Sequence, residues 1–177
     1  MNHQQSQQDM RSAYASGATG ALASGLIWTL AGVVGLLISE KASMLALFFG
    51  GMMIFPLSVL LSKLLKRSGK HDPNNDLRHL AFEGLGILFA GLFIAFVVAQ
   101  YNSLLFFPIM LLIIGARYLT FQSIYGLKIY WLLGGLLMLA GFMLTIFSLS
   151  FIAGAFIGGG IEIVFSWLIY VQGRKAD

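Results

Sequence analysis

Six long runs of apolar residues, separated by short polar segments, dominate the pattern of this chain. The runs fall at about 15–38, 44–62, 80–99, 104–121, 128–148 and 151–171. A helix that crosses the hydrocarbon core of a bilayer needs about 20 apolar residues, and each run comes close to that length. Transmembrane β-strands instead alternate apolar and polar residues over about 10 positions. The pattern therefore predicts an all-α polytopic membrane bundle of six transmembrane helices.

Short connections predict how neighbouring helices pair. The polar links at 39–43, 100–103 and 148–150 are long enough only for a tight reversal of the chain. We therefore expect three helical hairpins, formed by the first and second, third and fourth, and fifth and sixth runs. Pro56 and Pro108 lie inside two of the runs and predict kinks, because proline removes one backbone hydrogen bond.

The longest connection is a basic loop at 63–79 that contains turn-forming residues such as Pro73. Asp76, just before the third run, is the expected N-cap of that helix. The six runs leave no room for a soluble domain, so we expect residues 1–177 to form a single transmembrane domain. A polar tail at 1–14 precedes the first run.

Basic residues lie unequally on the two sides of the predicted bundle. Nine Lys and Arg residues lie on the side of the termini and the 63–79 loop, against only Lys41 on the other side. Arg117 lies inside a run and belongs to neither group. Because basic residues beside transmembrane helices favour the cytoplasm, we expect both termini, the tail and the loop to be cytoplasmic. The loop suits anionic lipid headgroups better than nucleic acid, since no interleaved aromatic platform or nucleic-acid fold accompanies it.

Composition supports a membrane protein and limits its chemistry. Hydrophobic residues make up 58% of the chain and charged residues 10%, which is more apolar surface than a soluble domain of this length buries. The absence of cysteine excludes disulfides, thiolate nucleophiles and Cys-ligated metals. His71 and Asp72, with His79 further on, do not make a metal site, because a flexible loop with two histidines lacks a third defined ligand. No catalytic motif occurs in a fitting context. We expect no cofactor, no metal site and no enzymatic activity.

Glu162 is the first candidate for chemistry, because it lies near the middle of the last run. An acid at this depth costs on the order of 3 kcal/mol to insert, so the carboxylate should face the bundle interior, a cavity or a partner. It would serve either as a proton or cation site or as a structural, hydrogen-bonded acid. Arg117 and Glu83, each one turn inside a helix, are candidate partners, although an arginine there also reaches the headgroups by snorkelling.

His79 lies one turn below Glu83 on the same helix, and Gln122 and Tyr118 could supply further hydrogen bonds. These residues together predict a polar cluster in the inner leaflet, made of Glu162, Arg117, Glu83, His79, Gln122 and Tyr118.

Four glycines precede Glu162 in the last run: Gly154, Gly158, Gly159 and Gly160. The GxxxG spacing of the first two lets helix backbones approach closely, whereas adjacent glycines also weaken a helix. One alternative is a packing face, whose partner is the small-residue stripe of the first run or a second protomer. The other is a hinge or a thinned wall at a solute site.

Three segments resemble a known family. Residues 50–66, 114–126 and 160–170 are similar to an uncharacterised family of small bacterial multi-pass membrane proteins that is defined by a domain of unknown function. The similarity covers nearly the whole chain, and its most specific part is Gly115-Ala116-Arg117-Tyr118 with Phe121. It implies a bacterial cytoplasmic (inner) membrane, and it brings no substrate, cofactor or catalytic residue.

Two functions from different classes stay open. One is a small transporter or channel that takes a solute or ion at the polar cluster. The alternative is a non-transport protein that binds lipid or scaffolds a partner, with the same charges as structural ties. Candidate partners are membrane lipids, a small solute or ion, and a second copy of the chain as a homodimer. A straight last helix with no cavity near Glu162 would favour the structural alternative.

Overall fold

The computed structural model describes residues 1–176, which fold into long helices joined by short turns. These are α1 (His3–Tyr14), η1 (Ala15–Gly17), α2 (Ala18–Leu37), α3 (Glu40–Leu64), α4 (Leu77–Ala99), η2 (Ser103–Leu105), α5 (Phe106–Tyr125), α6 (Ile129–Ile146) and α7 (Phe151–Ala176). Within this part of the chain no β-strand occurs, and six helical segments are long and apolar enough to cross a membrane. The prediction of an all-α chain with six such helices is therefore confirmed.

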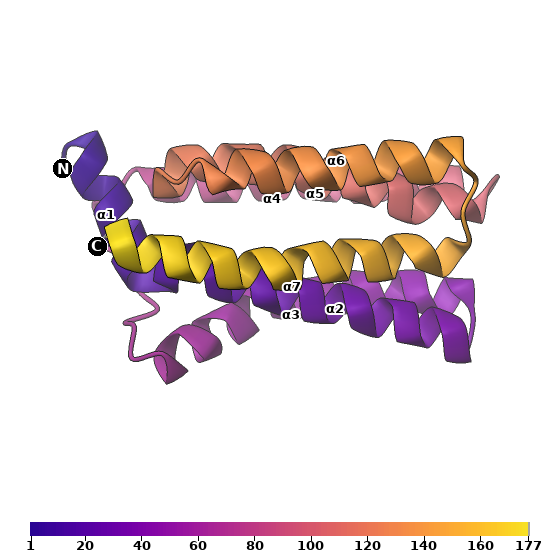
Figure 1. The fold of residues 1–177 in the computed structure, drawn as a ribbon, viewed down its shortest axis with the longest axis horizontal. Helices are drawn as coiled ribbons and strands as arrows, with labels where there is room; N and C mark the ends of the chain where they lie inside the picture. Colours follow the sequence, from indigo (N-terminus) through magenta and orange to yellow (C-terminus); the bar gives the residue numbers. More distant parts are fainter. Residues whose placement is uncertain (177) are drawn as a thin grey trace.

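The six long helices form two groups of three. In one group α2 packs against α3 and α7, and in the other α5 packs against α4 and α6. Figure 1 shows the two groups as separate layers. Because α6 and α7 belong to different groups and contact each other less closely, the third expected hairpin is divided between the layers. Both chain termini lie at the same end of the bundle (Figure 1), which we call the terminal end.

The outer surface of the bundle is strongly apolar. Large side chains on several helices, among them Leu37, Phe49 and Phe93, are more than half exposed. Contiguous apolar surface of this kind is unfavourable in water but matches the hydrocarbon of a bilayer. The surface thus agrees with the lengths of the helices in indicating a membrane protein.

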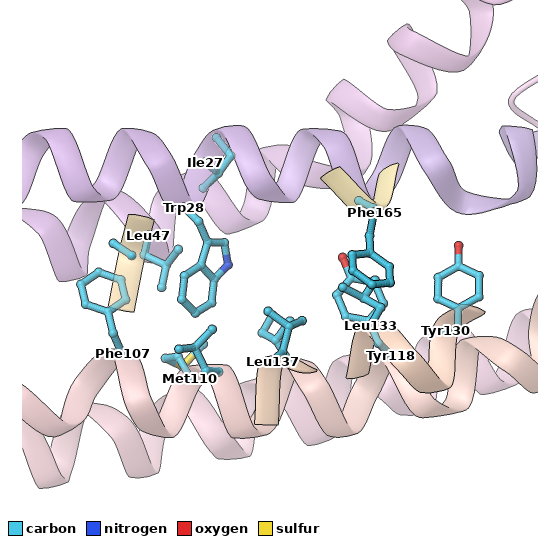
Figure 2. Packing of buried hydrophobic residues seen from close by; sticks show 14 of the residues in the cluster. Ile27, Trp28, Leu47, Phe107, Met110, Tyr118, Tyr130, Leu133, Leu137 and Phe165 are labelled. Atoms are coloured by element: carbon cyan, nitrogen blue, oxygen red, sulfur yellow. The ribbon is translucent and has the colours of Figure 1, made fainter. Parts of the chain in front are cut away.

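Buried aromatic and aliphatic side chains fill the space between the two groups. The rings of Trp28 on α2 and Phe107 on α5 lie 5.6 Å apart between centroids, and Leu111 and Leu137 beside them are fully buried. Figure 2 shows Trp28 pointing across this space toward Phe107, Met110 and Leu137. Since lipid is as apolar as these side chains, close packing rather than exclusion of water holds the groups together.

The polar segment at 1–14, expected as a tail, contains the helix α1. Asn2 and Gln5 form a capping box that starts the helix. After α1 the chain turns through Ala15, Ser16 and Gly17, which all have positive φ, at 49°, 58° and 83°. Non-glycine residues in this left-handed region are strained. The turn sets α1 at an angle to α2 at the terminal end (Figure 1).

Two local predictions need correction. Asp76 does occupy the N-cap position of α4, but its side chain makes no capping hydrogen bond, and Asn75 Oδ1 instead accepts from the N–H of Leu77 at 3.1 Å. Pro108 lies in the first turn of α5, where a missing N–H breaks no helical hydrogen bond, so no kink is needed there. Pro56 does lie inside α3, and Figure 1 shows the end of α3 turning away from the direction of the other helices.

Candidate functional site

Glu162 of α7 is fully buried where α7 meets α2 and α5. Its Oε1 accepts hydrogen bonds from Ser24 Oγ at 2.9 Å and from the Tyr118 hydroxyl at 2.8 Å. Its Oε2 is buried without a hydrogen-bond partner among the described residues. An unpaired polar atom in a low-dielectric interior is unfavourable and calls for a structural or functional reason. Glu162 therefore joins two other helices and still has one oxygen free.

Arg117, expected to pair with Glu162 or Glu83, forms an ion pair with neither within the described part of the chain. Its guanidinium lies 5.3 Å from the ring centroid of Phe121, and its Nε is buried without a partner. Glu162 is near enough for an electrostatic interaction with Arg117. The structure thus brings the two charges near each other while neutral hydroxyls make the hydrogen bonds to the acid.

Glu83 and His79 lie outside this cluster, since both are exposed on α4. Gly84 instead faces Arg117, and a Cβ at this glycine would lie 3.4 Å from Arg117 Nε. Neighbouring residues on an α-helix point about 100° apart, so the turn of α4 that brings Gly84 inward turns Glu83 outward. Gln122 is half-buried on α5, one turn after Tyr118.

A cavity of about 370 Å³ borders the cluster. Ser24 and Tyr118, the two donors to Glu162, form part of its wall, so Glu162 lies directly behind that wall. Apolar side chains of α3 and α4 form much of the remainder. Small-molecule sites typically measure about 300–1,000 Å³ and combine apolar walls with a few polar groups, which describes this cavity at the small end of the range.

The cavity opens sideways between α3 and α4. These helices flank it but barely touch each other, and their rim residues Phe55 and Phe82 are each 67% exposed. The opening therefore lies on the surface that faces lipid. At the terminal end, Met10 and Tyr14 of α1 cover the cavity together with His71.

Hydrogen bonds hold α1 in this covering position. Asn75 Nδ2 donates to Asp9 Oδ2 at 2.7 Å, which ties α1 to the segment before α4. Gln7 Nε2 donates to the carbonyl of Ser123 at 2.9 Å, which ties it to the end of α5. The sequence analysis missed this element, although the capping pair at the start of α1 is a signal of a helix.

The glycines of the last helix serve close packing. α7 is a continuous α-helix through Gly158 and Gly159. A Cβ at Gly159 would lie 2.8 Å from the carbonyl oxygen of Gly25 on α2, and a Cβ at Gly158 would lie 2.7 Å from the Trp28 ring. These contacts favour a packing face over a hinge, and the partner is the small-residue stripe of the first transmembrane helix.

The other two glycines differ from each other. Gly154 lies against Phe107, whereas a Cβ at Gly160 would meet nothing within 4 Å. Three of the four candidate glycines therefore face neighbouring helices, and Gly160 faces outward.

Comparison with known proteins places the chain in a family without assigning an activity. No curated protein and no solved structure matches it. The model of a family of unknown function, DUF7010, matches residues 3–172, which takes in α1, the cavity and the Glu162 cluster. This agrees with the resemblance to an uncharacterised family found in the sequence. The chain belongs to DUF7010, a family of unknown function.

Proposed function

We propose that this membrane protein binds a small amphipathic molecule that enters its cavity from the lipid phase, between α3 and α4. The cavity itself carries the proposal, because the apolar side chains of Phe55 and Phe82 on its wall are exposed toward lipid while other wall residues, among them Ser24 and Tyr118, supply polar groups. The apolar end of such a molecule would contact Phe55 and Phe82, and its polar end would meet Ser24 and Tyr118. Sites that bind small molecules commonly join these two kinds of surface.

Packing toward the opposite end of the bundle supports a closed binding site over an open channel. Trp28, Phe106, Phe107 and Leu111 are almost completely buried between the two helix groups. A permanent pore needs polar or water-filled space along its whole length. The cavity is thus expected to receive its ligand without offering a continuous path across the bilayer in this conformation.

A pair of glycine variants tests the proposal. Gly51 lines the cavity, and a Cβ there meets nothing within 4 Å, so Gly51→Phe places a ring in the binding space. Gly86 on α4 is equally unobstructed but does not line the cavity, so Gly86→Phe is the matched control. Each protein in lipid vesicles is irradiated with a 12-carbon alcohol that carries a diazirine, and labelled peptides are identified by mass spectrometry.

Labelling is expected to concentrate on the cavity-lining turns of α3 and α4 in the wild type and in Gly86→Phe. Gly51→Phe should lower it at least tenfold. Labelling spread evenly over the lipid-facing surface, or equal labelling in the two variants, would refute the proposal.

Transport is a second candidate function, and Glu162 favours it. A membrane-buried carboxylate with one unpaired oxygen, directly behind a cavity, resembles the acids that bind protons or cations in transporters. Glu162→Gln keeps an oxygen that accepts from Ser24 and Tyr118 while removing the charge. Proton uptake into vesicles, driven by a potassium diffusion potential and followed with an internal pH dye, should then be slower than in the wild type. Equal rates would eliminate this candidate.

We infer that the terminal end faces the cytoplasm, on the support of the nine-to-one distribution of basic residues. The resemblance seen in the sequence supports the inner membrane of a bacterium as its location. Lys70 is exposed at the terminal end, and Tyr101 is 90% exposed at the other. Because the chain has no native cysteine, Lys70→Cys and Tyr101→Cys each provide a unique label site. In intact cells an impermeant maleimide should label only Tyr101→Cys. Labelling of Lys70→Cys alone would show that the orientation is the opposite of the one inferred.

A further inference from the structure

We propose that the ligand of the cavity is an anionic single-chain amphiphile whose headgroup is bound by Arg117. This inference rests on the proposed function and names the chemical class of its ligand. It follows from the charges of the cavity wall, from the unpaired state of Arg117 and from the direction in which the cavity opens.

The cavity wall contains basic groups, and none of the described residues that line it is acidic. Arg78 and His71 lie toward the terminal end, and Arg117 lies beside Tyr118 on the inner wall. Arg78 donates to the carbonyl of Pro73 at 2.6 Å, so it already has a neutral partner. A negatively charged group is therefore the complement that this wall lacks.

Arg117 is the cation best placed to bind that group. The nearest acid, Glu162, is not part of the cavity wall. Its Oε1 accepts from Ser24 and Tyr118, and its Oε2 makes no hydrogen bond to Arg117 or to any other described residue. Arg117 Nε is buried and unpaired. A buried guanidinium without a hydrogen-bonded acceptor is unfavourable, even with a carboxylate nearby, whereas a ligand's carboxylate or phosphate group would match the guanidinium fork with two parallel hydrogen bonds.

The opening of the cavity between α3 and α4 indicates where the hydrophobic part of the ligand would lie. Phe82, Leu85 and Leu88 of α4 and Phe55 of α3 lead from the inner wall to the lipid-facing rim. A chain that starts at Arg117 would run between α3 and α4 into the bilayer. The volume of about 370 Å³ lies at the small end of the range for small-molecule sites, which favours a single-chain amphiphile over a two-chain phospholipid.

Competition against the diazirine alcohol tests the headgroup. The competitors are laurate, dodecyl phosphate and dodecanol, which share a 12-carbon chain and differ in charge. In the wild type we expect at least one of the anions to displace the label at a concentration at least tenfold below that of dodecanol. The more effective anion then identifies the headgroup as carboxylate or phosphate.

Two arginine variants separate a specific site from a general charge effect. Arg117→Gln should abolish the preference for the anion and leave competition by dodecanol unchanged. Arg174→Gln removes the same charge from the end of α7, where Arg174 lies over Tyr170 and outside the cavity, and should keep the full preference. Partition of the competitors into the vesicles is common to all variants, so the difference between variants reports the site.

Each outcome decides the question. If the label reaches the cavity but all three competitors act equally on the wild type, the headgroup assignment is wrong and the proposed function stands. If no label reaches the cavity, both fail. Should Arg117→Gln not fold, as judged by thermal unfolding, Arg117→Lys takes its place, because it keeps the charge without the bidentate geometry and should weaken the preference partially. If the Arg117 variant that is used kept a preference for the anion as strong as that of Arg174→Gln, the role of Arg117 would be overturned.

Discussion

Two helix contacts in this bundle contrast sharply, although all four helices that form them are apolar enough to cross a membrane. In the first, which we call the closed seam, α2 and α7 approach so closely at Gly25 and Gly159 that added Cβ atoms would overlap the facing backbone. In the second, the open seam, α3 and α4 barely touch, and the exposed rings of Phe55 and Phe82 flank a cavity. Within lipid, helices associate through close van der Waals packing and not through the hydrophobic effect. Small residues therefore close one seam, and bulky ones leave the other available to a ligand.

The largest expected effect is at Trp28, which fills the space beside the closed seam and is almost fully buried. Trp28→Ala should lower the free energy of unfolding by about 3 kcal/mol, because it leaves a void that its neighbours cannot fill. Phe82→Ala at the open seam removes a ring that faces lipid and should cost less than about 0.5 kcal/mol. Reversible unfolding in mixed detergent micelles measures both. Equal losses would mean that the two seams are packed alike.

A smaller but more specific effect is expected at Gly159. Gly159→Ala pushes a methyl group against the backbone of α2 and should cost about 2 kcal/mol, the usual range for overpacking. The adjacent Gly160→Ala meets only open space and should be neutral or slightly stabilising, since alanine favours the helix. If the two variants were equally stable, the closed seam would not depend on close approach and the hinge interpretation of α7 would regain support.

The sequence predicts the helices well, because the length of an apolar run in a membrane is a strong physical constraint. It also finds Glu162, since a carboxylate in hydrocarbon must turn inward. The sequence does not determine which face of each helix points inward or which helices pack against each other. α4 is apolar around most of its circumference, so no amphipathic face indicates that Gly84 turns inward and Glu83 outward. Ser24, a buried partner of Glu162, looks in sequence like one more small residue of a packing stripe.

The position of α1 over the cavity could not be predicted from the sequence either. α1 contains mainly polar residues, and the docking of such a helix depends on hydrogen bonds to segments far away in the chain, such as those from Asn75 and Gln7. The positive φ angles of Ala15 and Ser16 have no local signal either, because neither residue favours the left-handed region.

At the terminal end, the cavity of the open seam is bounded by α1 and by the turn that follows it. Tyr130 tests how firmly this turn is held. The hydroxyl of Tyr130 donates to the carbonyl of Ser16 at 2.6 Å in a fully buried position. Tyr130→Phe leaves that carbonyl unpaired and should cost about 1 kcal/mol, less than at the closed seam because hydrogen bonds in membrane proteins are modest in net strength. Tyr101→Phe, at an exposed tyrosine, should have no measurable effect. A neutral Tyr130→Phe would show that the turn after α1 is held by other contacts.

The smallest expected effect concerns the strain in that turn, at Ala15. A non-glycine residue at positive φ costs roughly 1–2 kcal/mol, and glycine removes this penalty while adding about 0.5–1 kcal/mol of backbone entropy cost. Ala15→Gly should therefore stabilise the protein by about 0.5 kcal/mol. Ala18→Gly, at the start of α2 with a helical φ of −57°, has no strain to release and should cost about 1 kcal/mol. Opposite signs in the same unfolding assay would show that α1 is held over the cavity against local strain, whereas a loss of stability from both would mean that Ala15 adopts its left-handed conformation without appreciable cost.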